Sequence, residues 1–342
     1  MSGLNDLGWN DTWQMERDAM EAAGAPCRVV RHDGIKVLVS DGATVQHVAF
    51  PRSMKLAVGD WVVVKNETVQ ALCARRTVLE RDHEIRGPQI IAANVDVVLV
   101  VFGSDRPLRQ SKVMRFVAFA WDIGANPIVI ISKVDLVDGT AEMTRQLATW
   151  LPDVDVLTTS VDTGEGVDDV FAALEGKTGT FIGESGAGKS SLVNAMMEDE
   201  VAWVGEVREV DSKGRHVTSH RELHLLPGGG MIIDNPGVRA LGLSAQGEGV
   251  ESLFSDIEAL ASQCRFRDCS HDAEPGCAVR AAVHNGAVRE DRYQGYLRFV
   301  MEQGVAQDRA HDKDIAAHFR REAAAVREAR ETRDGDGLTP RD

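Results

Sequence analysis

The feature that most constrains the fold of this chain is a glycine-rich segment, Gly183–Ser190, which follows a short apolar run and precedes a helical pattern. It fits G-x-x-x-x-G-K-S, in which glycines let backbone N–H groups curl around phosphate oxygens at the positive end of a helix. The segment therefore predicts a phosphate-binding α/β domain, in which Lys189 contacts the β- and γ-phosphates and the Ser190 hydroxyl binds Mg²⁺. The residues expected to contact phosphate are Gly183, Glu184, Ser185, Gly186, Ala187, Gly188, Lys189 and Ser190.

Strand-like apolar runs alternate with helical patterns up to this segment. The runs are Val95–Phe102, Pro127–Ile131, Val154–Thr158 and Thr180–Ile182. Residues between them place apolar side chains at helical spacing, and such alternation predicts a mostly parallel sheet with helices on both faces. We therefore expect an α/β domain over residues 87–250.

A candidate base-reading motif, Ser132-Lys133-Val134-Asp135, follows the second of these runs. Its shape is that of [N/T]-K-x-D, in which the carboxylate, here Asp135, accepts from the guanine N1–H and exocyclic amine, a donor edge that adenine lacks. Ser132 stands where Asn is usual. The tetrapeptide alone fits a solvated Lys/Asp turn equally well, but Ser160 and Val161, after the next strand, extend the expected base site and favour guanine.

A third motif, Asp234-Asn235-Pro236-Gly237, ends another apolar run. In D-x-x-G, the carboxylate of Asp234 holds Mg²⁺ through water and the amide of Gly237 reaches the γ-phosphate. The polar segment 214–219 suits a switch loop in which Thr218 completes the Mg²⁺ ligands, with Ser219 as the alternative; a plain loop is the simpler interpretation. The expected Mg²⁺ ligands are Ser190, Thr218 and Asp234.

The residue after this motif is Val238, and an aliphatic side chain cannot orient a water molecule for hydrolysis. Hydrolysis is then expected to be slow without help, and His216 in the switch segment is a candidate helper. His216 fits a structural or RNA-contacting role as well.

The order of the motifs is informative. The base-reading motifs precede the phosphate loop, whereas they follow it in ordinary GTP-binding domains. We therefore expect a circularly permuted domain, which proteins tolerate because the termini of a domain lie close together.

Three cysteines and one histidine cluster near the C-terminus with the spacing Cys264-x₄-Cys269-x-His271-x₅-Cys277. Three thiolates and one imidazole match a closed tetrahedral Zn²⁺ site of the structural kind. The alternative of scattered buried cysteines suits Cys27 and Cys73 better than this cluster.

The N-terminal part of the sequence has a different residue pattern. Short β-type runs separated by turn signals over residues 25–86 predict an OB-like barrel, with an SH3-like barrel as the alternative. We expect residues 1–24 to form an acidic, loose or partly helical leader. We expect a zinc-binding and helical C-terminal domain over 251–333 and a disordered tail over 334–342. The expected architecture is thus an all-β barrel, a permuted α/β phosphate-loop domain and a mainly α zinc domain.

The net charge of −15 is unevenly distributed. Residues 87–261 hold 13 basic and 26 acidic residues, whereas residues 25–86 hold 10 and 7. Nucleic acid is therefore expected to contact the flanking domains rather than the acidic core. The lack of a signal peptide and of a membrane-spanning run favours the cytoplasm.

The chain resembles the ribosome small-subunit-dependent GTPase A family (RsgA, also called YjeQ) over about residues 25–300. The resemblance is carried by the motifs above and by 89–96, Gly183–Ser191, 213–216 and 264–271. It implies Ser191 in the GTP site, an OB-fold that contacts ribosomal RNA, activation by the 30S subunit and a role in late 30S maturation.

We therefore expect a monomeric GTPase that hydrolyses GTP to GDP with Mg²⁺, binds the 30S subunit and 16S rRNA, and carries one structural Zn²⁺. An RNA-binding scaffold with weak nucleotide turnover is the first alternative. A permuted GTPase acting on another ribosomal particle and an ATPase are the others.

Overall fold

The computed structural model describes residues 3–81, 89–198, 221–234, 254–272, 274–290, 292–298 and 300–301. The chain divides into two compact units, Met1–Ser244 with Glu251–Ser255, and Ala245–Val250 with Asp256–Asp342. In the described residues no helix is long and apolar enough to cross a membrane.

The N-terminal part of the first unit contains a five-stranded barrel. Its strands are β1 (Ala25–His32), β2 (Lys36–Ser40), β3 (Val45–Ala49), β4 (Trp61–Lys65) and β5 (Thr68–Leu72). Pairing of β1 with β4 and of β3 with β5 closes the barrel. Alternate positions carry Val, Leu or Cys side chains into one core, which includes Val29, Val39 and Val62, so the predicted N-terminal barrel is confirmed.

The leader is an ordered part of this unit. A 3₁₀ turn, η1 (Leu4–Leu7), precedes helix α1 (Asp11–Ala19), which starts where the Asn10 side chain accepts from the backbone N–H groups of Thr12 and Trp13. Trp9 and Trp13 are buried and pack with Trp61 of the barrel, at ring-centroid distances of 4.7 and 6.2 Å. Aromatic burial on this scale fixes a short helix that its own propensity would not.

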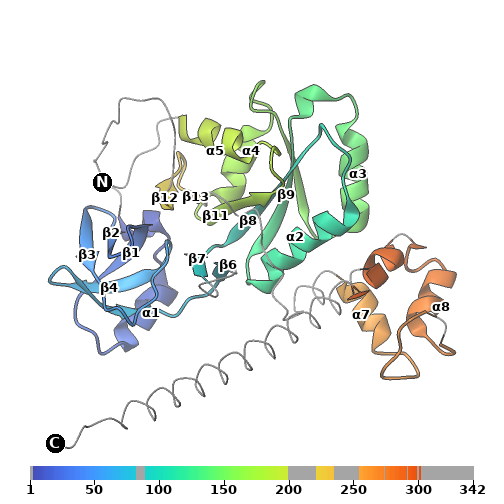
Figure 1. Ribbon diagram of the computed structural model, residues 1–342, viewed down its shortest axis with the longest axis horizontal. Helices are drawn as coiled ribbons and strands as arrows, with labels where there is room; N and C mark the ends of the chain where they lie inside the picture. Colours follow the sequence, from blue (N-terminus) through green and yellow to red (C-terminus); the bar gives the residue numbers. More distant parts are fainter. Residues whose placement is uncertain are drawn as a thin grey trace, which may run out of the picture. The chain divides into compact units, whose positions relative to one another are not determined.

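The α/β part of the first unit has the predicted parallel sheet (Figure 1). Strands β10 (Asp155–Thr159), β9 (Asn126–Ser132), β8 (Val97–Gly103), β11 (Thr178–Gly183) and β13 (Met231–Asp234) lie side by side in that order, and all neighbours are parallel. Strand β12 (Glu222–Leu225) pairs antiparallel with β13, as expected for a hairpin.

Helices cover both faces of this sheet. α2 (Gln110–Asp122) and α3 (Thr140–Trp150) lie on one face, and α4 (Val167–Leu174) and α5 (Lys189–Glu198) lie on the other (Figure 1). Strand β8 is buried along its whole length, so its side chains pack into the apolar cores on both faces of the sheet. Leu99 packs toward Leu174 and Leu192, whereas Phe102 meets Phe116 of α2 edge-on at 6.0 Å.

Barrel and α/β domain share hydrogen bonds. Strand β1 pairs with β12 through Arg31 and Glu222, so the two sheets run together as one 11-stranded sheet. A second hairpin, β6 (Val78–Arg81) and β7 (Gln89–Ala93), has one strand on each side of the expected boundary at 86/87.

A fully buried arginine lies at this junction. Arg28 donates to the hydroxyl of Thr178 (2.8 Å) and to the carbonyl oxygens of Asn94 (3.3 Å), Gly59 (3.4 Å) and Leu7. Burial lowers the pKa of Arg28 to about 10. Four segments that are distant in sequence therefore meet on one guanidinium.

The second unit is helical, as predicted. Helices α7 (Ser255–Ala261) and α8 (Ala278–His284) flank the cysteine-containing segment, and residues 292–298 form a further helical stretch. Arg292 pairs with Asp256 at 2.6 Å, and the Tyr296 hydroxyl lies 2.9 Å from Glu258. These contacts join the last described helix to α7.

Candidate nucleotide site and cysteine cluster

The phosphate loop lies between β11 and α5, as the motif requires. Gly183, Gly186 and Gly188 all have positive φ, at 135°, 77° and 86°. A Cβ on Gly183 would lie 2.2 Å from the carbonyl oxygen of Val101, so this position accepts glycine alone. Local backbone geometry thus explains why the loop needs its glycines.

Lys189 begins helix α5, and its side chain folds back over the loop. Its Nζ donates to the carbonyl oxygens of Gly183 (2.8 Å) and Glu184 (2.6 Å). Ser190 and Ser191 follow it and are exposed. The ammonium group is therefore held at the concave loop where the motif predicts it.

Ser132 ends β9 and is buried. Its hydroxyl lies 2.6 Å from the carbonyl oxygen of Ala187 and 3.1 Å from that of Phe102. A hydroxyl has one proton to donate, and the shorter of the two contacts is the one to the phosphate loop. The serine that replaces the usual asparagine thus ties the base-reading motif to the phosphate loop.

The remaining base-reading residues lie at neighbouring strand ends. Thr159 of β10 pairs with Ser132 of β9, which brings the segments after both strands together. The Ser160 hydroxyl lies 2.5 Å from Oδ1 of Asp135, and Lys133 has a left-handed backbone at φ 60°. Val134 belongs to the short 3₁₀ turn η2 (Val134–Leu136), and Val161 is 37% exposed. The structure thus brings the two parts of the expected base site together.

Asp234 ends β13, next to β11 at the same edge of the sheet. Burial raises the pKa of its carboxyl above the ordinary value, and His224 opposes this rise. A neighbouring cation would favour the ionised form of such a carboxyl, so Asp234 and the Ser190 hydroxyl fit an oxygen-ligated Mg²⁺. His216, Thr218 and Gly237 lie outside the described residues.

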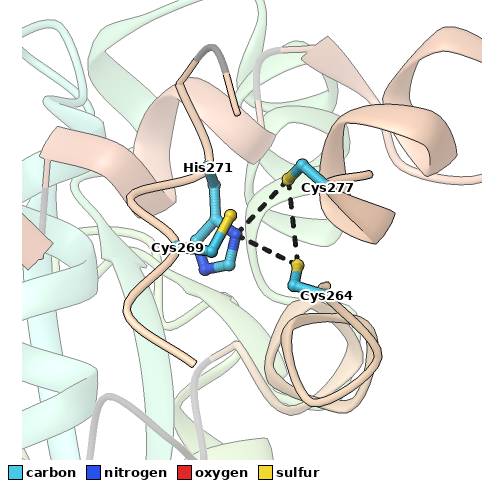
Figure 2. Close-up of side chains that lie close together, drawn as sticks. All are labelled: Cys264, Cys269, His271 and Cys277. Carbon is cyan, nitrogen blue, oxygen red and sulfur yellow. Dashed lines mark hydrogen bonds between the residues drawn. The ribbon is translucent and has the colours of Figure 1, made fainter. Parts of the chain in front are cut away.

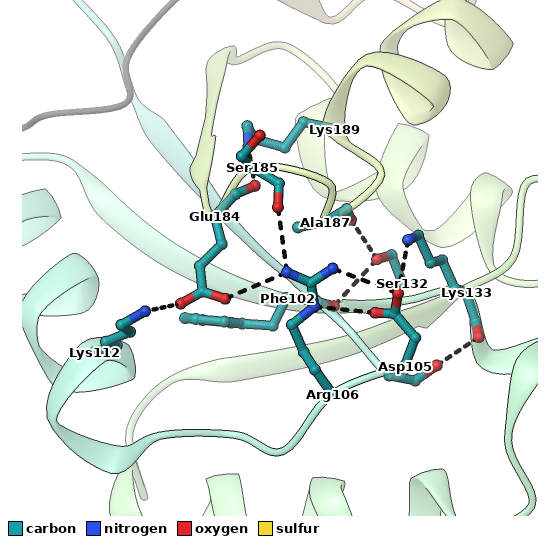
Figure 3. A network of polar contacts seen from close by, with 11 residues as sticks. Phe102, Asp105, Arg106, Lys112, Ser132, Lys133, Glu184, Ser185, Ala187 and Lys189 are labelled. Atoms are coloured by element: carbon teal, nitrogen blue, oxygen red, sulfur yellow. Dashed lines mark hydrogen bonds and ion pairs between the residues drawn. The ribbon is translucent and has the colours of Figure 1, made fainter.

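A charged segment that no sequence motif marks follows β8. Figure 3 shows Asp105 and Arg106 beside the phosphate loop and the base-reading motif. Lys133 Nζ lies 3.1 Å from Asp105 Oδ2, and Arg106 Nη1 lies 3.3 Å from the carbonyl oxygen of Ser185. Hydrogen bonds from Lys133, and then from Arg106, hold the pKa of Asp105 below its ordinary value.

Glu184 completes this set of charges. Its carboxylate pairs with Lys112 of α2, and its other oxygen lies 3.9 Å from Arg106 Nη1. The sequence signal for this segment is its position directly after an apolar strand, because ligands of α/β sheets bind at the carboxyl ends of the strands. Strand β8 lies between the two strands that carry the predicted motifs.

The four cysteine-cluster residues converge in the second unit (Figure 2). The ligand atoms of Cys264, Cys269, His271 and Cys277 all lie within 4.8 Å of one another. Nδ1 of His271 is 3.5 Å from both Cys264 Sγ and Cys277 Sγ. This cysteine cluster can therefore hold one metal ion.

Local backbone geometry prepares the cluster for a cation. The N–H of Ala278 lies 3.3 Å from Cys264 Sγ, and that of Arg280 lies 3.4 Å from Cys277 Sγ. Burial opposes ionisation of the Cys264 thiol, but backbone N–H donors at Val279 and Ala278 leave its pKa below the ordinary value. A donor set of three thiolates and one imidazole suits Zn²⁺. The Tyr293 hydroxyl donates to the carbonyl of His271 at 2.6 Å and fixes the loop that carries this histidine.

Comparisons with known proteins agree on one family. The sequence model described as RsgA GTPase matches residues 72–244. A small ribosomal subunit biogenesis GTPase RsgA of Streptomyces coelicolor is 38% identical, over 98% of this chain and 96% of its own. A protein named small ribosomal subunit biogenesis GTPase RsgA 2, of Vibrio parahaemolyticus, is 35% identical over 91% of this chain and 90% of its own.

Solved structures show the same fold. The crystal structure of YjeQ from Thermotoga maritima is 26% identical, covers 82% of this chain and 98% of its own, and has a TM-score of 0.62. The structure of YloQ, described as a circularly permuted GTPase, is also 26% identical, with 85% and 98% covered and a TM-score of 0.63. The predicted circular permutation therefore has a solved counterpart.

Proposed function

Because the chain belongs to the RsgA GTPase family, we propose that it binds the small ribosomal subunit in its GTP state during late maturation and leaves after hydrolysing GTP to GDP and phosphate. The observation that carries this proposal is the joining of the phosphate loop to the base-reading motif. Ser132 of β9 bonds to Ala187 of the loop, and Asp135 bonds to Ser160 after β10. One nucleotide can then contact both motifs.

Each residue has a role in this proposal. The N–H groups of Gly183–Ser190 and the Lys189 ammonium bind the phosphates, and the Asp135 carboxylate reads the guanine edge. Ser190 and Asp234, with Thr218, would hold Mg²⁺, which neutralises charge on the β- and γ-phosphates. His216 would help to orient the attacking water, and Gly237 would contact the γ-phosphate.

The remaining GTP-site residues would shape the walls of the site. Val134, Ser160 and Val161 lie beside the expected position of the base. Ser191 follows the Mg²⁺-binding serine at the start of α5. Glu184 and Ser185 would contribute through the loop backbone.

The cysteine cluster would bind one structural Zn²⁺ through Cys264, Cys269, His271 and Cys277. A metal there would tie α7 to α8, because Cys264 follows the first helix and Cys277 caps the second. It would couple metal binding to the folding of this small unit rather than take part in hydrolysis.

Contacts with 16S rRNA are assigned to the domains that flank the acidic core. The segment 25–86 carries more basic than acidic residues. Around the cysteine cluster, Arg265, Arg267, Arg280 and Arg289 are exposed, and Arg265 lies 5.5 Å over the Phe266 ring. Exposed arginines beside an exposed aromatic ring suit phosphate and base contacts. We assign the site of action to the cytoplasm and the active form to a monomer.

Co-sedimentation with separated ribosomal subunits tests this proposal. The chain is mixed with 30S or 50S particles in the presence of a non-hydrolysable GTP analogue or GDP. We expect it to pellet with 30S particles in the presence of the analogue, less with GDP, and less as salt is raised. Equal pelleting with 50S particles, or none with 30S, would contradict the proposed partner.

A further inference from the structure

We propose that Arg106 is a positioning residue of the phosphate loop. Together with Ser132 it would hold the outer side of the loop, and we call this pair of side chains the clamp. The inference rests on the proposed function, since it concerns the same nucleotide site. No motif marks Arg106. It lies between β8 and α2, and its side chain lies against the phosphate loop (Figure 3).

The two side chains of the clamp donate hydrogen bonds to two backbone carbonyl groups of the loop. Arg106 Nη1 lies 3.3 Å from the carbonyl oxygen of Ser185, and Ser132 Oγ lies 2.6 Å from that of Ala187. In a trans peptide the C=O and the following N–H point in opposite directions. Holding these carbonyls on the outside therefore turns the N–H groups of Gly186 and Gly188 toward the phosphates.

Glycine makes such a clamp necessary. Gly186 and Gly188 have φ of 77° and 86°, and glycine adopts many other backbone conformations at little cost. A loop built from such residues needs external hydrogen bonds to stay in one conformation. The more completely the loop is pre-organised, the less conformational entropy the loop loses when a nucleotide binds.

Arg106 is itself held by a network of charges. Its Nε lies 3.3 Å from Asp105 Oδ1, and Glu184 approaches its Nη1 at 3.9 Å. Asp105 also accepts from Lys133 of the base-reading motif at 3.1 Å, and Glu184 pairs with Lys112. The guanidinium thus links the segment after β8, the phosphate loop and the base-reading motif. Because the Arg106 side chain is 41% exposed, solvent screens each pair and the effect of one substitution is moderate.

Contact on the outer side distinguishes positioning from direct phosphate contact. The Ser185 carbonyl belongs to the same peptide as the Gly186 N–H but lies on its opposite side. Loss of Arg106 should therefore weaken the binding of GDP and of GTP by the same factor. It should also raise KM for GTP and leave kcat unchanged. A guanidinium that contacted the γ-phosphate would affect GTP alone.

The test compares Arg106→Met, Arg106→Lys and a matched control, Arg109→Met. Arg109 is exposed three residues further on, and its side chain makes no hydrogen bond or ion pair with the described residues. Arg109→Met removes the same charge from the same segment without touching the loop. Affinities for fluorescent GDP and a non-hydrolysable GTP analogue are measured for each chain, with KM and kcat for GTP.

We expect Arg106→Met to raise both Kd values equally, by about 3- to 10-fold, which is the scale of one lost hydrogen bond. Arg106→Lys should recover part of the affinity, and Arg109→Met should match the unmodified chain. Unchanged Kd values in Arg106→Met, or a loss confined to the GTP analogue, would overturn the clamp. If Arg106→Met does not fold, the single variants Arg106→Lys and Ser132→Ala replace it. Unchanged nucleotide affinity in both of them would overturn the clamp.

The same data separate this inference from the proposed function. If the unmodified chain binds no guanine nucleotide, the function and the clamp are both wrong. If it binds normally but does not associate with 30S particles, the proposed partner is wrong and the clamp stands.

Discussion

The nucleotide site and the cysteine cluster are both polar sites prepared by backbone geometry, but they are assembled in different ways. All four residues of the cluster come from one short segment, Cys264–Cys277, whose ends are fixed by α7 and α8. The proposed nucleotide site combines residues from five segments between Gly103 and Asp234, which the parallel sheet brings to one edge. We therefore expect a bound metal to order the first site, whereas the packing of a large domain orders the second.

Metal removal should produce the largest effect. A structural zinc site contributes about 10–16 kcal/mol of apparent binding free energy, which exceeds the stability of a small unit without it. We expect Cys277→Ser, or a strong chelator, to remove the metal and to abolish hydrogen-exchange protection over 254–298. Metal content and hydrogen exchange measure this.

We expect nucleotide affinity to survive the same treatment, because the proposed nucleotide site belongs to the other unit. Cys27→Ser is the matched control, since this buried cysteine lies in the barrel core. Retained protection of 254–298 without metal would show that the cluster does not organise its own unit.

Lys189→Ala should produce the next largest effect. Its ammonium is the fixed charge at the loop, and removal of one such donor from a charge-stabilising site costs about 100- to 1000-fold in rate. We expect a loss of this order in GTP turnover, with the metal content of the cysteine cluster unchanged. Lys177→Ala, at the opposite end of β11, is the control and should keep normal turnover; comparable losses in both variants would contradict the role of Lys189.

Asp135→Asn tests the base-reading part of the nucleotide site. A hydrogen bond to a charged group contributes about 1.5–3 kcal/mol, so we expect GTP affinity to fall by about 10- to 100-fold and discrimination against ATP to weaken. Competition between GTP and ATP for a fluorescent nucleotide measures both effects. Asp138→Asn, an exposed neighbour, controls for the lost charge, and unchanged GTP affinity in Asp135→Asn would exclude this carboxylate as the guanine reader.

Ser132→Ala should produce the smallest effect. It removes one buried hydrogen bond to the loop, which corresponds to about a 3- to 10-fold loss of affinity. The loss should be equal for GDP and GTP, because the bond lies on the outer side of the loop. Nucleotide titrations measure it, and a loss for one nucleotide alone would place the hydroxyl in contact with phosphate instead.

Features that are local in the chain, or that repeat along it, could be predicted from the sequence. The phosphate loop, the base-reading tetrapeptide and the cysteine cluster are contiguous, so residue types and spacing determine their local geometry. The parallel sheet followed from the alternation of apolar runs with helical patterns. Each of these features depends either on residues that are close together in the chain or on a repeating pattern of apolar residues.

Features that depend on contacts between distant segments were not predicted. Arg28 gathers carbonyls and a hydroxyl from four separate segments, and nothing in its immediate sequence indicates burial. The pairing of β1 with β12 joins two domains through residues far apart in the chain. Arg106 reaches the phosphate loop because β8 and β11 are neighbours, which motif spacing does not reveal.

The most direct test of the account is the rate of GTP turnover as purified 30S subunits are added. We expect slow turnover by the chain alone and a many-fold, saturable rise with 30S particles. That rise should be lost in Lys189→Ala and absent with 50S particles. Turnover that stays at the basal rate at saturating 30S would contradict the central claim, that this chain is a GTPase activated by the small ribosomal subunit.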